Sequence, residues 1–477
     1  MTPDEFRRLG HRLIDWIADY REGIEQRAVR SQVAPGAVRA ALPASAPEVP
    51  EDLGALLIDD VERLLMPGLT HWQHPSFHAY FPGNASYASV LADLLSTGLG
   101  QTGITWQASP ALTELEETTT DWLRQLLGLS PAWQGVIHDT ASTATLAALL
   151  CARERTSDHS QTRAGLQAET APLVVYTSRE AHSSVAKAAL LAGFGRENLR
   201  LVAVDAVFAM RAEALEHAIR ADLAAGRRPC AIVATTGTTA TTAIDPIAAI
   251  AAIARAHGVW LHVDAAMAGS AMICPEKRVL WEGVEAADSI VMNPHKWLGV
   301  AFDCSLYLVR DAEHLVRVMS TNPSYLQSSG GESGRSLRDW GLPLGRRFRA
   351  LKLWLHLRAE GAQALRARLR RDMANAQWFA AQVDAAPGWL RLAPVPLQTV
   401  CVRHEPVGPD GDLLDAHTLA WVERVNASGR ALLTPSQLDG RWMVRVSIGA
   451  TGTERPHVEA LWTLLQQAVR GDVAARG

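Results

Sequence analysis

One feature constrains the fold of this chain more than any other: between residues 130 and 310, short apolar runs alternate with helical segments. The runs are rich in β-branched residues, which favours strands, and segments such as 183–191, 211–224 and 246–257 have helical spacing. Strands that alternate with helices form a mostly parallel sheet with helices on both faces. We therefore expect an α/β fold with strands at 173–177, 199–204, 230–236, 259–264, 289–292 and 305–309.

The segments on either side follow other patterns. Thr2 to Glu5 form a capping box before an amphipathic helix over residues 1–25, and a second helix is expected over 53–66. After residue 345 the pattern predicts a long helix at 346–371, an extended run at 390–402 and a helix at 414–428. A hairpin follows, with its turn at Asp439-Gly440 and its second strand at 442–448, and then a last helix at 456–469. We expect an N-terminal helical arm, a large domain and a smaller α+β domain, at 1–80, 81–350 and 351–477.

Composition excludes several classes of protein. The 477 residues carry a formal net charge of −4, which does not favour a nucleic-acid-binding protein. The five cysteines form no CxxC pair, which argues against a zinc ribbon or a disulfide framework and suits a reducing compartment. No uncharged apolar stretch is long enough to span a membrane, and the first residues lack the apolar region of a signal peptide. We expect a cytoplasmic protein.

Lysine is rare in this chain, since only four of its 46 basic residues are lysines. A desolvated lysine can become a neutral nucleophile, whereas arginine stays charged. Lys296 follows the strand at 289–292, and ligands of parallel sheets bind beyond the carboxyl ends of strands. An amine at that position can form a Schiff base with an aldehyde. For Lys187, Lys277 and Lys352 the sequence context favours ordinary surface positions.

Asp264 ends the strand at 259–264 and is expected at the same edge of the sheet. Alone it could equally cap a helix or turn. Together with Lys296 it indicates a site for pyridoxal phosphate, because this cofactor requires a lysine for its aldehyde and an acid for its pyridinium nitrogen. The carboxylate keeps the ring nitrogen protonated, so that the ring can accept electrons.

Two further segments could complete a cofactor site. The hydroxyl-rich segment from Thr140 to Thr145 opens a helix, where backbone N–H groups can hold a phosphate or simply be capped. His182 starts a helix after the strand at 173–177 and could stack on a flat ring or cap that helix. The chain has neither a GxGxxG motif after a strand nor a P-loop, which disfavours dinucleotide and nucleotide binding.

Two other patterns are weaker. His71, His74 and His78 have helical spacing, but Pro75 breaks a helix there, so no metal site is expected. The glycine-serine segment 328–334 lies beside Tyr325 and would be an active-site lid or a surface linker.

These motifs are shared with a known family. The chain resembles the group II pyridoxal-phosphate decarboxylases, and within them the aromatic-L-amino-acid decarboxylases, over nearly its whole length. The resemblance rests on segments at 5–8, 67–72, 80–82, 105–116, 262–266, 293–297 and 343–349. Among these, Asn293-Pro-His-Lys296 combined with His262-Val-Asp264-Ala is highly specific.

The resemblance implies an aspartate-aminotransferase-like fold (fold type I), an obligate homodimer clasped by the N-terminal arm, and pyridoxal 5'-phosphate as cofactor. Lys296 would bind the cofactor's aldehyde, Asp264 its ring nitrogen, and His182 would stack on the ring, with His295 beside the lysine. The remaining cofactor-binding residues would be Thr140, Ala141, Ser142, Thr235, Ala266 and Asn293.

The resemblance also implies a reaction, the conversion of an aromatic L-amino acid of the Trp, Tyr, Phe or Dopa class to its arylalkylamine and CO2. Tyr325, acting at the neighbouring subunit's site, would return a proton to Cα; relatives that make aldehydes typically have Phe there. The substrate would be lined by Tyr80, Phe81, Gly83, Ile104, Trp106 and Gly345. Gly345 favours an aromatic substrate, since related histidine decarboxylases usually carry Ser. The alternatives are an aromatic aldehyde synthase, a transaminase, a decarboxylase of another amino acid such as histidine, or a cofactor-binding protein with a decayed site.

Three positions depart from the family pattern. Met267 replaces a Tyr, Gly83-Asn84 replaces Thr-Ala near the substrate carboxylate, and Asp139-Thr140 replaces Gly-Ser at the phosphate turn. The first two bear on substrate choice. The third bears on cofactor affinity, because an acid near a phosphate is unfavourable unless it points away.

Overall fold

The structure is a computed structural model that describes residues 1–321, 334–408 and 410–472, apart from the side chain of residue 161. The chain forms two compact units. The first unit comprises residues 1–82, 374–392 and 400–477, and the second comprises 83–373 and 393–399. The predicted three-part division, with its dimer-clasping arm, stays a prediction.

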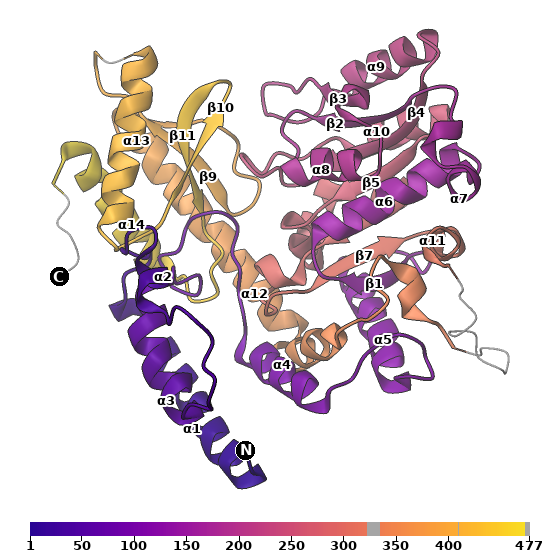
Figure 1. Ribbon diagram of the computed structural model, residues 1–477. Coiled ribbons are helices and arrows are strands. Elements are labelled where there is room, and N and C mark those ends of the chain that lie inside the picture. Colours follow the sequence, from indigo (N-terminus) through magenta and orange to yellow (C-terminus); the bar gives the residue numbers. More distant parts are fainter. Residues whose placement is uncertain (322–333, 409, 473–477) are drawn as a thin grey trace. The chain divides into compact units, whose positions relative to one another are not determined.

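A seven-stranded sheet forms the centre of the second unit, with strand order β1-β7-β6-β5-β4-β2-β3 (Figure 1). The four pairings that join β6, β5, β4, β2 and β3 are parallel, and β7 runs antiparallel to both β1 and β6. The predicted, mostly parallel sheet is confirmed. The strands are β1 Gln134–His138, β2 Leu173–Ser178, β3 Leu199–Val202, β4 Arg228–Thr235, β5 Trp260–Asp264, β6 Ser289–Met292 and β7 Ser305–Val309.

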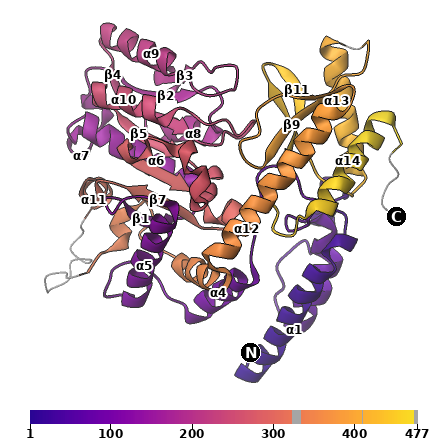
Figure 2. The same cartoon turned by 180° about the vertical axis from the view of Figure 1, so that it is seen from behind.

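The chain path puts helices on both faces of this sheet. The connection from β2 to β3 moves along the sheet in one direction, whereas those from β3 to β4 and from β4 to β5 move in the other. Because crossovers between parallel strands are right-handed, α8 covers one face and α9 and α10 cover the other. α6 packs on α8 and so shares its face (Figure 2). These helices are α6 Ala141–Thr156, α8 Ser183–Leu191, α9 Ala212–Ala224 and α10 Ile247–His257.

The second unit also contains helices that the sequence analysis did not anticipate. They include α4 Tyr87–Leu99 and α5 Pro110–Leu127, and α5 packs against β1. Both end in a left-handed glycine, Gly100 and Gly128, which closes the last turn of each helix. Two shorter helices complete the unit, α7 Ser160–Arg163 and α11 Ala312–Met319.

The first unit is built around a second sheet of order β10-β11-β9-β8. α13 packs on β11 and on α14. In α1 the predicted capping box is present, because Thr2 Oγ1 accepts from the Glu5 amide while the Glu5 carboxylate accepts from the Thr2 amide. The elements are α1 Pro3–Glu22, α2 Ala37–Ala41, α3 Leu53–Ala55, β8 Trp389–Arg391, β9 Thr399–His404, α13 Gly411–Ala427, β10 Thr434–Leu438, β11 Arg441–Ser447 and α14 Arg455–Arg470.

Two predictions after residue 345 differ clearly from the structure. The long helix α12 spans Arg349–Ala385 and contributes to both units; it continues past residue 371 because Phe379 and Val383 keep an apolar face buried. The expected run at 390–402 is two strands, since Pro394 and Pro396 cannot donate to a strand ladder. Among the described residues, no helix is both long enough and apolar enough to cross a bilayer.

Buried histidines make the stability of this fold sensitive to acid. Burial lowers the pKa of five imidazoles from 6.5 to about 4; they belong to His78, His138, His262, His295 and His356. Between pH 6.5 and pH 4 these imidazoles take up protons in the unfolded chain but not in the native protein. The free energy of unfolding that they contribute is therefore fully present above pH 6.5 and is lost as the pH falls toward 4. Two buried carboxyls, of Asp245 and Asp372, oppose this, because burial raises their pKa to about 6.

We expect the urea midpoint of the protein to fall between about pH 7 and about pH 5, because five histidines outweigh two carboxyls. The variant His138→Gln keeps a donor for the Trp340 carbonyl, which lies 2.9 Å from His138 Nε2, but has no titratable ring. Its midpoint should fall less than that of the wild type. The urea midpoints of both proteins are measured with and without added cofactor. If both midpoints fell by the same amount, His138 would not contribute to the loss of stability in acid.

Candidate active site

The sheet topology brings the predicted site residues to one edge. β2, β4, β5 and β6 are parallel, and β1 has the same direction because both β1 and β6 run antiparallel to β7. The carboxyl ends of these five strands therefore meet at one edge of the sheet. The segments that follow them carry the expected cofactor residues, namely Thr140–Ser142, His182, Thr235, Asp264 and Asn293–Lys296.

Three of these residues act on one another electrostatically. Loss of solvation lowers the pKa of the His182 imidazole; the Asp264 carboxylate raises that pKa, and the Lys296 ammonium lowers it. The charges of the carboxylate and of the amine therefore both act on the His182 imidazole. Asp264 is 5% exposed, so its charge acts in a site with little water.

Backbone hydrogen bonds hold the acid and the lysine segment together. Asp264 Oδ1 accepts from the amide of Ala266 at 3.0 Å, and the Ala266 carbonyl accepts from the amide of Asn293 at 2.8 Å. Pro294 follows and prevents β6 from continuing, as the sequence predicts. Lys296 then lies in the short helical turn Pro294–Leu298 with non-helical torsions, φ −96° and ψ −111°. The Asp264 carboxylate is thus fixed relative to the start of the lysine turn.

The two predicted histidines have defined roles in the structure. His182 is the N-cap of α8, where its Nδ1 accepts from the Ser184 amide at 3.2 Å. His295 Nδ1 accepts from the amide of Cys304 at 2.8 Å, which leaves Nε2 to carry the proton. Burial, together with the charge of Lys296, lowers the pKa of His295 to about 4, so this imidazole is neutral at neutral pH.

A set of hydrogen-bond donors fits the phosphate of the expected cofactor. Thr140 is the N-cap of the 16-residue α6, and the first amides of a helix have no partner within it. Thr235 Oγ1 is buried and has no hydrogen-bond partner among the described residues. Asn293 Oδ1 accepts from Ser305 Oγ at 2.7 Å. Because the oxygen of this side chain is bound to Ser305, its NH2 group is the end that can donate to a phosphate. Amides, a hydroxyl and a carboxamide are donors suited to an anion.

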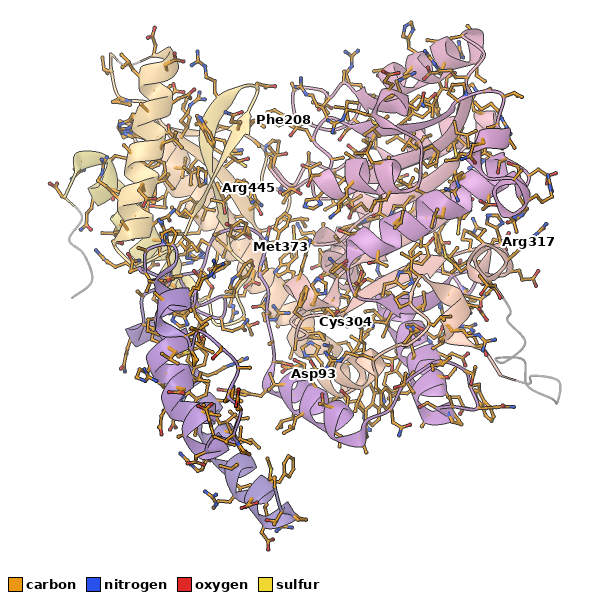
Figure 3. All side chains as sticks on the ribbon, viewed as in Figure 1. Asp93, Phe208, Cys304, Arg317, Met373 and Arg445 are labelled. Atoms are coloured by element: carbon orange, nitrogen blue, oxygen red, sulfur yellow. The ribbon has the colours of Figure 1, made fainter. Side chains whose placement is uncertain are left out.

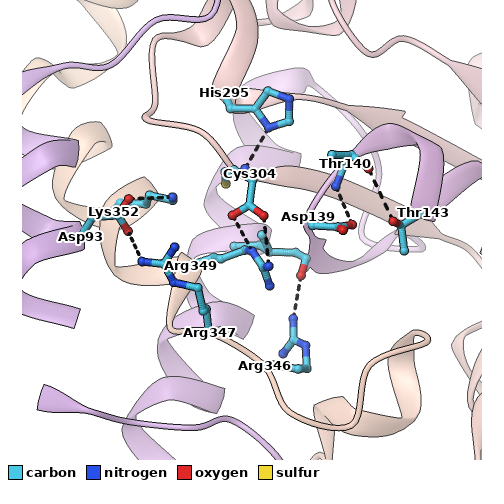
Figure 4. Close-up of polar contacts among 12 residues, drawn as sticks. Asp93, Asp139, Thr140, Thr143, His295, Cys304, Arg346, Arg347, Arg349 and Lys352 are labelled. Carbon is cyan, nitrogen blue, oxygen red and sulfur yellow. Dashed lines mark hydrogen bonds and ion pairs between the residues drawn. The ribbon is translucent and has the colours of Figure 1, made fainter. Parts of the chain in front are cut away.

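The departure at the phosphate turn has a structural consequence. Asp139 Oδ1 accepts from the Thr140 amide at 2.7 Å, so one donor at the start of α6 is already occupied (Figure 4). The Arg349 guanidinium pairs with Asp303 through two contacts of 3.0 and 3.2 Å. The negative charge of Asp139 also helps to raise the pKa of Arg349. This arginine lies close enough to offset part of the negative charge beside the phosphate turn.

The other lysines show how far sequence context can be trusted. Lys187 is exposed on α8, as expected. Lys277 donates to the Pro396 carbonyl at 3.3 Å. The surface position expected for Lys352 is wrong, because its side chain is fully buried and pairs with Asp93 at 2.9 Å (Figure 4). The Asp93 carboxylate also faces Arg347 at 3.5 Å, and such a partner cannot be seen from the neighbours of Lys352 in the sequence.

The predicted substrate residues are divided between the units. Gly83, Ile104, Trp106 and Gly345 lie in the second unit, where Trp106 Nε1 donates to Glu114 at 2.9 Å. A Cβ at Gly345 would meet only one atom within 4 Å, at 3.8 Å, so this position is open. Tyr80 and Phe81 lie in the first unit. Tyr325 and most of the segment 328–334 lie outside the described residues, and the substrate pocket stays a prediction.

The sequence analysis noted Asn84 only as a departure from the family pattern and did not anticipate that it and three residues of α12 support the lysine turn. Asn84 is 1% exposed and donates from Nδ2 to the Lys296 carbonyl at 3.3 Å. His356, Arg368 and Asp372 of α12 contact the next two residues. No short motif marks the three residues of α12; only a buried polar residue in a helix pattern could have drawn attention to them.

The histidines at 71, 74 and 78 bind other groups within the first unit. His71 Nδ1 is 2.9 Å from the Tyr20 hydroxyl, and His78 Nδ1 is 3.3 Å from the Ser447 carbonyl. Within the residues that the structure describes, no group of three or more metal-ligating side chains could hold a metal ion. All five cysteines are buried as free thiols; one of them, Cys304, is labelled in Figure 3.

Comparison with known proteins gives full-length relatives. Phenylacetaldehyde synthase from Arabidopsis thaliana is 41% identical over 98% of this chain and 96% of its own length. Aromatic-L-amino-acid decarboxylase from Bos taurus is 41% identical over 100% of this chain and 98% of its own. A crystal structure of Oryza sativa TDC with PLP and tryptamine superimposes with a TM-score of 0.95, at 35% identity, and covers 99% of both chains.

A family model confirms the predicted fold type, enzyme class and cofactor. Residues 35–404 match the pyridoxal-dependent decarboxylase conserved domain. The matched range includes the lysine turn, the acid at the end of β5 and the start of α6, which the structure brings to one edge. The chain is therefore a carbon–carbon lyase that uses pyridoxal 5'-phosphate, and it belongs to the pyridoxal-dependent decarboxylase family.

Proposed function

We propose that this protein decarboxylates an aromatic L-amino acid of the Trp, Tyr, Phe or Dopa class to the arylalkylamine and CO2. One observation carries the proposal: Asp264, at the end of β5, accepts from the amide of Ala266, and the Ala266 carbonyl accepts from the amide of Asn293, so the acid and the segment that carries Lys296 lie together at the carboxyl edge of the sheet. Relatives that are aromatic amino acid decarboxylases support the choice of substrate class.

Each residue has a role that follows from its chemistry. The bound cofactor supplies an aldehyde for an amino group and a ring that accepts electrons. Lys296 would hold the aldehyde through its amine, and Asp264 would keep the proton on the ring nitrogen. His182 would stack on the ring, and His295, neutral and hydrogen-bonded to Cys304, would flank the lysine without adding charge.

The remaining cofactor residues bind the phosphate or the ring edge. The start of α6 supplies amides and hydroxyls, Thr235 supplies a buried hydroxyl, and Asn293 supplies an amide fixed by Ser305. These residues would fix the orientation of the cofactor at this edge of the sheet. The cofactor residues at this edge are Thr140, Ala141, Ser142, Thr235, Ala266 and Asn293.

A second candidate function is supported by the aldehyde synthase among the relatives. Decarboxylation to the amine needs a proton for Cα once CO2 has left, and the phenol of Tyr325 can donate it whereas a phenyl group cannot. Its presence favours the amine as product. We further propose that Tyr80, Phe81, Gly83, Ile104, Trp106 and Gly345 line the aromatic side chain.

The test is product analysis with the holoprotein. We expect CO2 and the amine, in equal amounts, from at least one of Trp, Tyr, Phe, Dopa and 5-hydroxytryptophan, and none from histidine. The variant Tyr325→Phe should lose most of its amine product, on the order of tenfold or more, and release aldehyde and ammonia instead. No product from any aromatic substrate would refute the proposal, and aldehyde from the wild type would favour the second candidate.

We also propose that the enzyme is a cytoplasmic homodimer. A row of apolar side chains is exposed on α4 within the second unit, which is typical of a surface that another chain covers; it consists of Tyr87, Leu91, Leu94, Leu95 and Leu99. The five free thiols suit a reducing compartment. Sedimentation of the wild type and of Leu91→Glu tests the dimer, and the variant should be monomeric.

A further inference from the structure

The carbonyl groups of the turn that carries Lys296 are bound by side chains from outside that turn. The Lys296 carbonyl accepts from Asn84 Nδ2 at 3.3 Å. The Trp297 carbonyl accepts from Arg368 Nη2 at 2.7 Å. The Leu298 carbonyl accepts from the same nitrogen at 2.8 Å and from His356 Nε2 at 3.0 Å. Three successive peptide groups are therefore oriented by side chains, two of which come from α12.

The indole of Trp297 is held in the same way. Trp297 is 0% exposed, and its Nε1 donates to Asp372 Oδ2 at 2.9 Å. Asp372 also comes from α12, four residues after Arg368, so that both side chains point from one face of the helix. One residue next to the lysine is thus held at its carbonyl by a guanidinium and at its side chain by a carboxylate.

Burying the carboxylate of Asp372 to hold Trp297 in place costs free energy. Asp372 is 0% exposed, its Oδ1 has no hydrogen-bond partner in the described part of the chain, and its ion-pair contact with Arg371 Nε is 3.6 Å long. A buried carboxylate that is only partly compensated contributes less to stability than an apolar residue of similar size. What the carboxylate does provide is a directional acceptor at a fixed point.

That direction matters for Lys296. The peptide between Lys296 and Trp297 is the one whose torsion departs from a helix, with ψ −111° at Lys296. The carbonyl of this peptide is held by Asn84, and Trp297, which supplies its amide, is held at its own carbonyl by Arg368 and at its indole by Asp372. A rotation of this peptide would therefore disturb the bond to Asn84 directly and the two bonds of Trp297 through the backbone. The orientation of this peptide sets the direction in which the lysine side chain leaves the backbone.

We propose that Asp372, acting through the indole of Trp297, is a positioning residue that sets the orientation of the Lys296 side chain toward the cofactor. The inference rests on the proposed function, in which Lys296 binds the cofactor's aldehyde. Arg368, His356 and Asn84 hold the carbonyls of the same turn, and Asp372 holds its one large side chain.

The test compares three variants with a matched control. Asp372→Leu removes the acceptor, Trp297→Phe removes the donor, and Asp372→Asn keeps an oxygen that the indole can reach. The control is Asp222→Leu, since Asp222 is 3% exposed and accepts from the hydroxyl of buried Tyr176 at 2.9 Å, in a part of the sheet away from the lysine turn. Both aspartates are buried, and both bind an aromatic side chain.

Three measurements are made on each protein: the pH midpoint of the visible absorption of the bound cofactor, the rate at which apoprotein captures added pyridoxal phosphate, and kcat with KM. Asp372→Leu and Trp297→Phe should both shift the absorption midpoint by about half a pH unit or more and lower capture rate and kcat roughly tenfold, with KM within about twofold of the wild type. Asp372→Asn should restore all three to within about twofold. Asp222→Leu should lower the urea midpoint and leave the other measurements unchanged.

Two results would overturn the inference. One is a folded Asp372→Leu, or Trp297→Phe if the first does not fold, with unchanged absorption and capture rate. The other is a shift of the absorption midpoint and a fall in capture rate in Asp222→Leu as large as in Asp372→Leu, because both changes would then reflect a general loss of stability. A wild type without a lysine-dependent absorption band would instead refute the proposed function, so the two failures are distinguishable.

Discussion

Replacing Lys296 with alanine is expected to abolish decarboxylation, with a loss in kcat/KM on the order of 10³-fold or more, because no other group can hold the cofactor's aldehyde at this edge. The other lysines of the second unit are exposed, bound to a carbonyl, or buried in an ion pair with Asp93. The visible absorption of the bound cofactor should disappear together with the activity.

A matched control makes this result specific. Lys187→Ala removes an exposed lysine from α8, the helix that His182 caps, and should leave both activity and absorption unchanged. CO2 release and amine are measured on both variants at saturating pyridoxal phosphate. A Lys296→Ala protein that keeps the absorption band would show that another amine binds the cofactor.

Replacing Asp264 with asparagine should lower kcat by a factor on the order of 10²–10³, because the amide cannot keep the ring nitrogen protonated. The substitution is nearly isosteric, and Asn Oδ1 can still accept from the Ala266 amide. We therefore expect the protein to fold and to bind its cofactor, with most of the loss in kcat and little change in KM.

Asp288→Asn is the control for this substitution. Asp288 Oδ2 accepts from the Leu261 amide at 2.7 Å near the start of β5, at the opposite end of the strands. This variant should keep the activity of the wild type. If Asp264→Asn retained more than about a third of wild-type kcat, the acid would have no role in stabilising charge on the ring.

Local chemistry explains which parts of the fold could be predicted from sequence. The strands at 289–292 and 305–309 were predicted to the residue, because each is a short apolar run with clear ends. Helix α12 was predicted 14 residues too short at its carboxyl end (371 against 385), because its buried face continues through a polar stretch that resembles a helix end. The helices α4 and α5 were not anticipated.

The residues of the candidate site also fall into those that could be predicted from sequence and those that could not. Lys296 and Asp264 could be singled out because each is a charged residue that directly follows an apolar strand, and the parallel sheet requires their strands to end at one edge. The burial of Lys352 could not be foreseen, because Asp93, its partner, lies 259 residues away. The contacts of Asn84, Arg368 and Asp372 with the lysine turn could not be foreseen for the same reason, since they join segments that are distant in the sequence.

The amino-acid sequence by itself determined which groups are available for chemistry: one lysine and one acid placed after strands, a hydroxyl-rich helix start, and the periodicity that requires a parallel sheet. Only the tertiary structure decided which groups meet. It joined the Lys296 turn to α12, left the Thr235 hydroxyl buried without a partner among the described residues, and directed the Asp139 carboxylate to the first amide of the phosphate turn. The physical reason is that strand periodicity acts over a few residues, whereas burial and hydrogen bonding depend on which segments pack together.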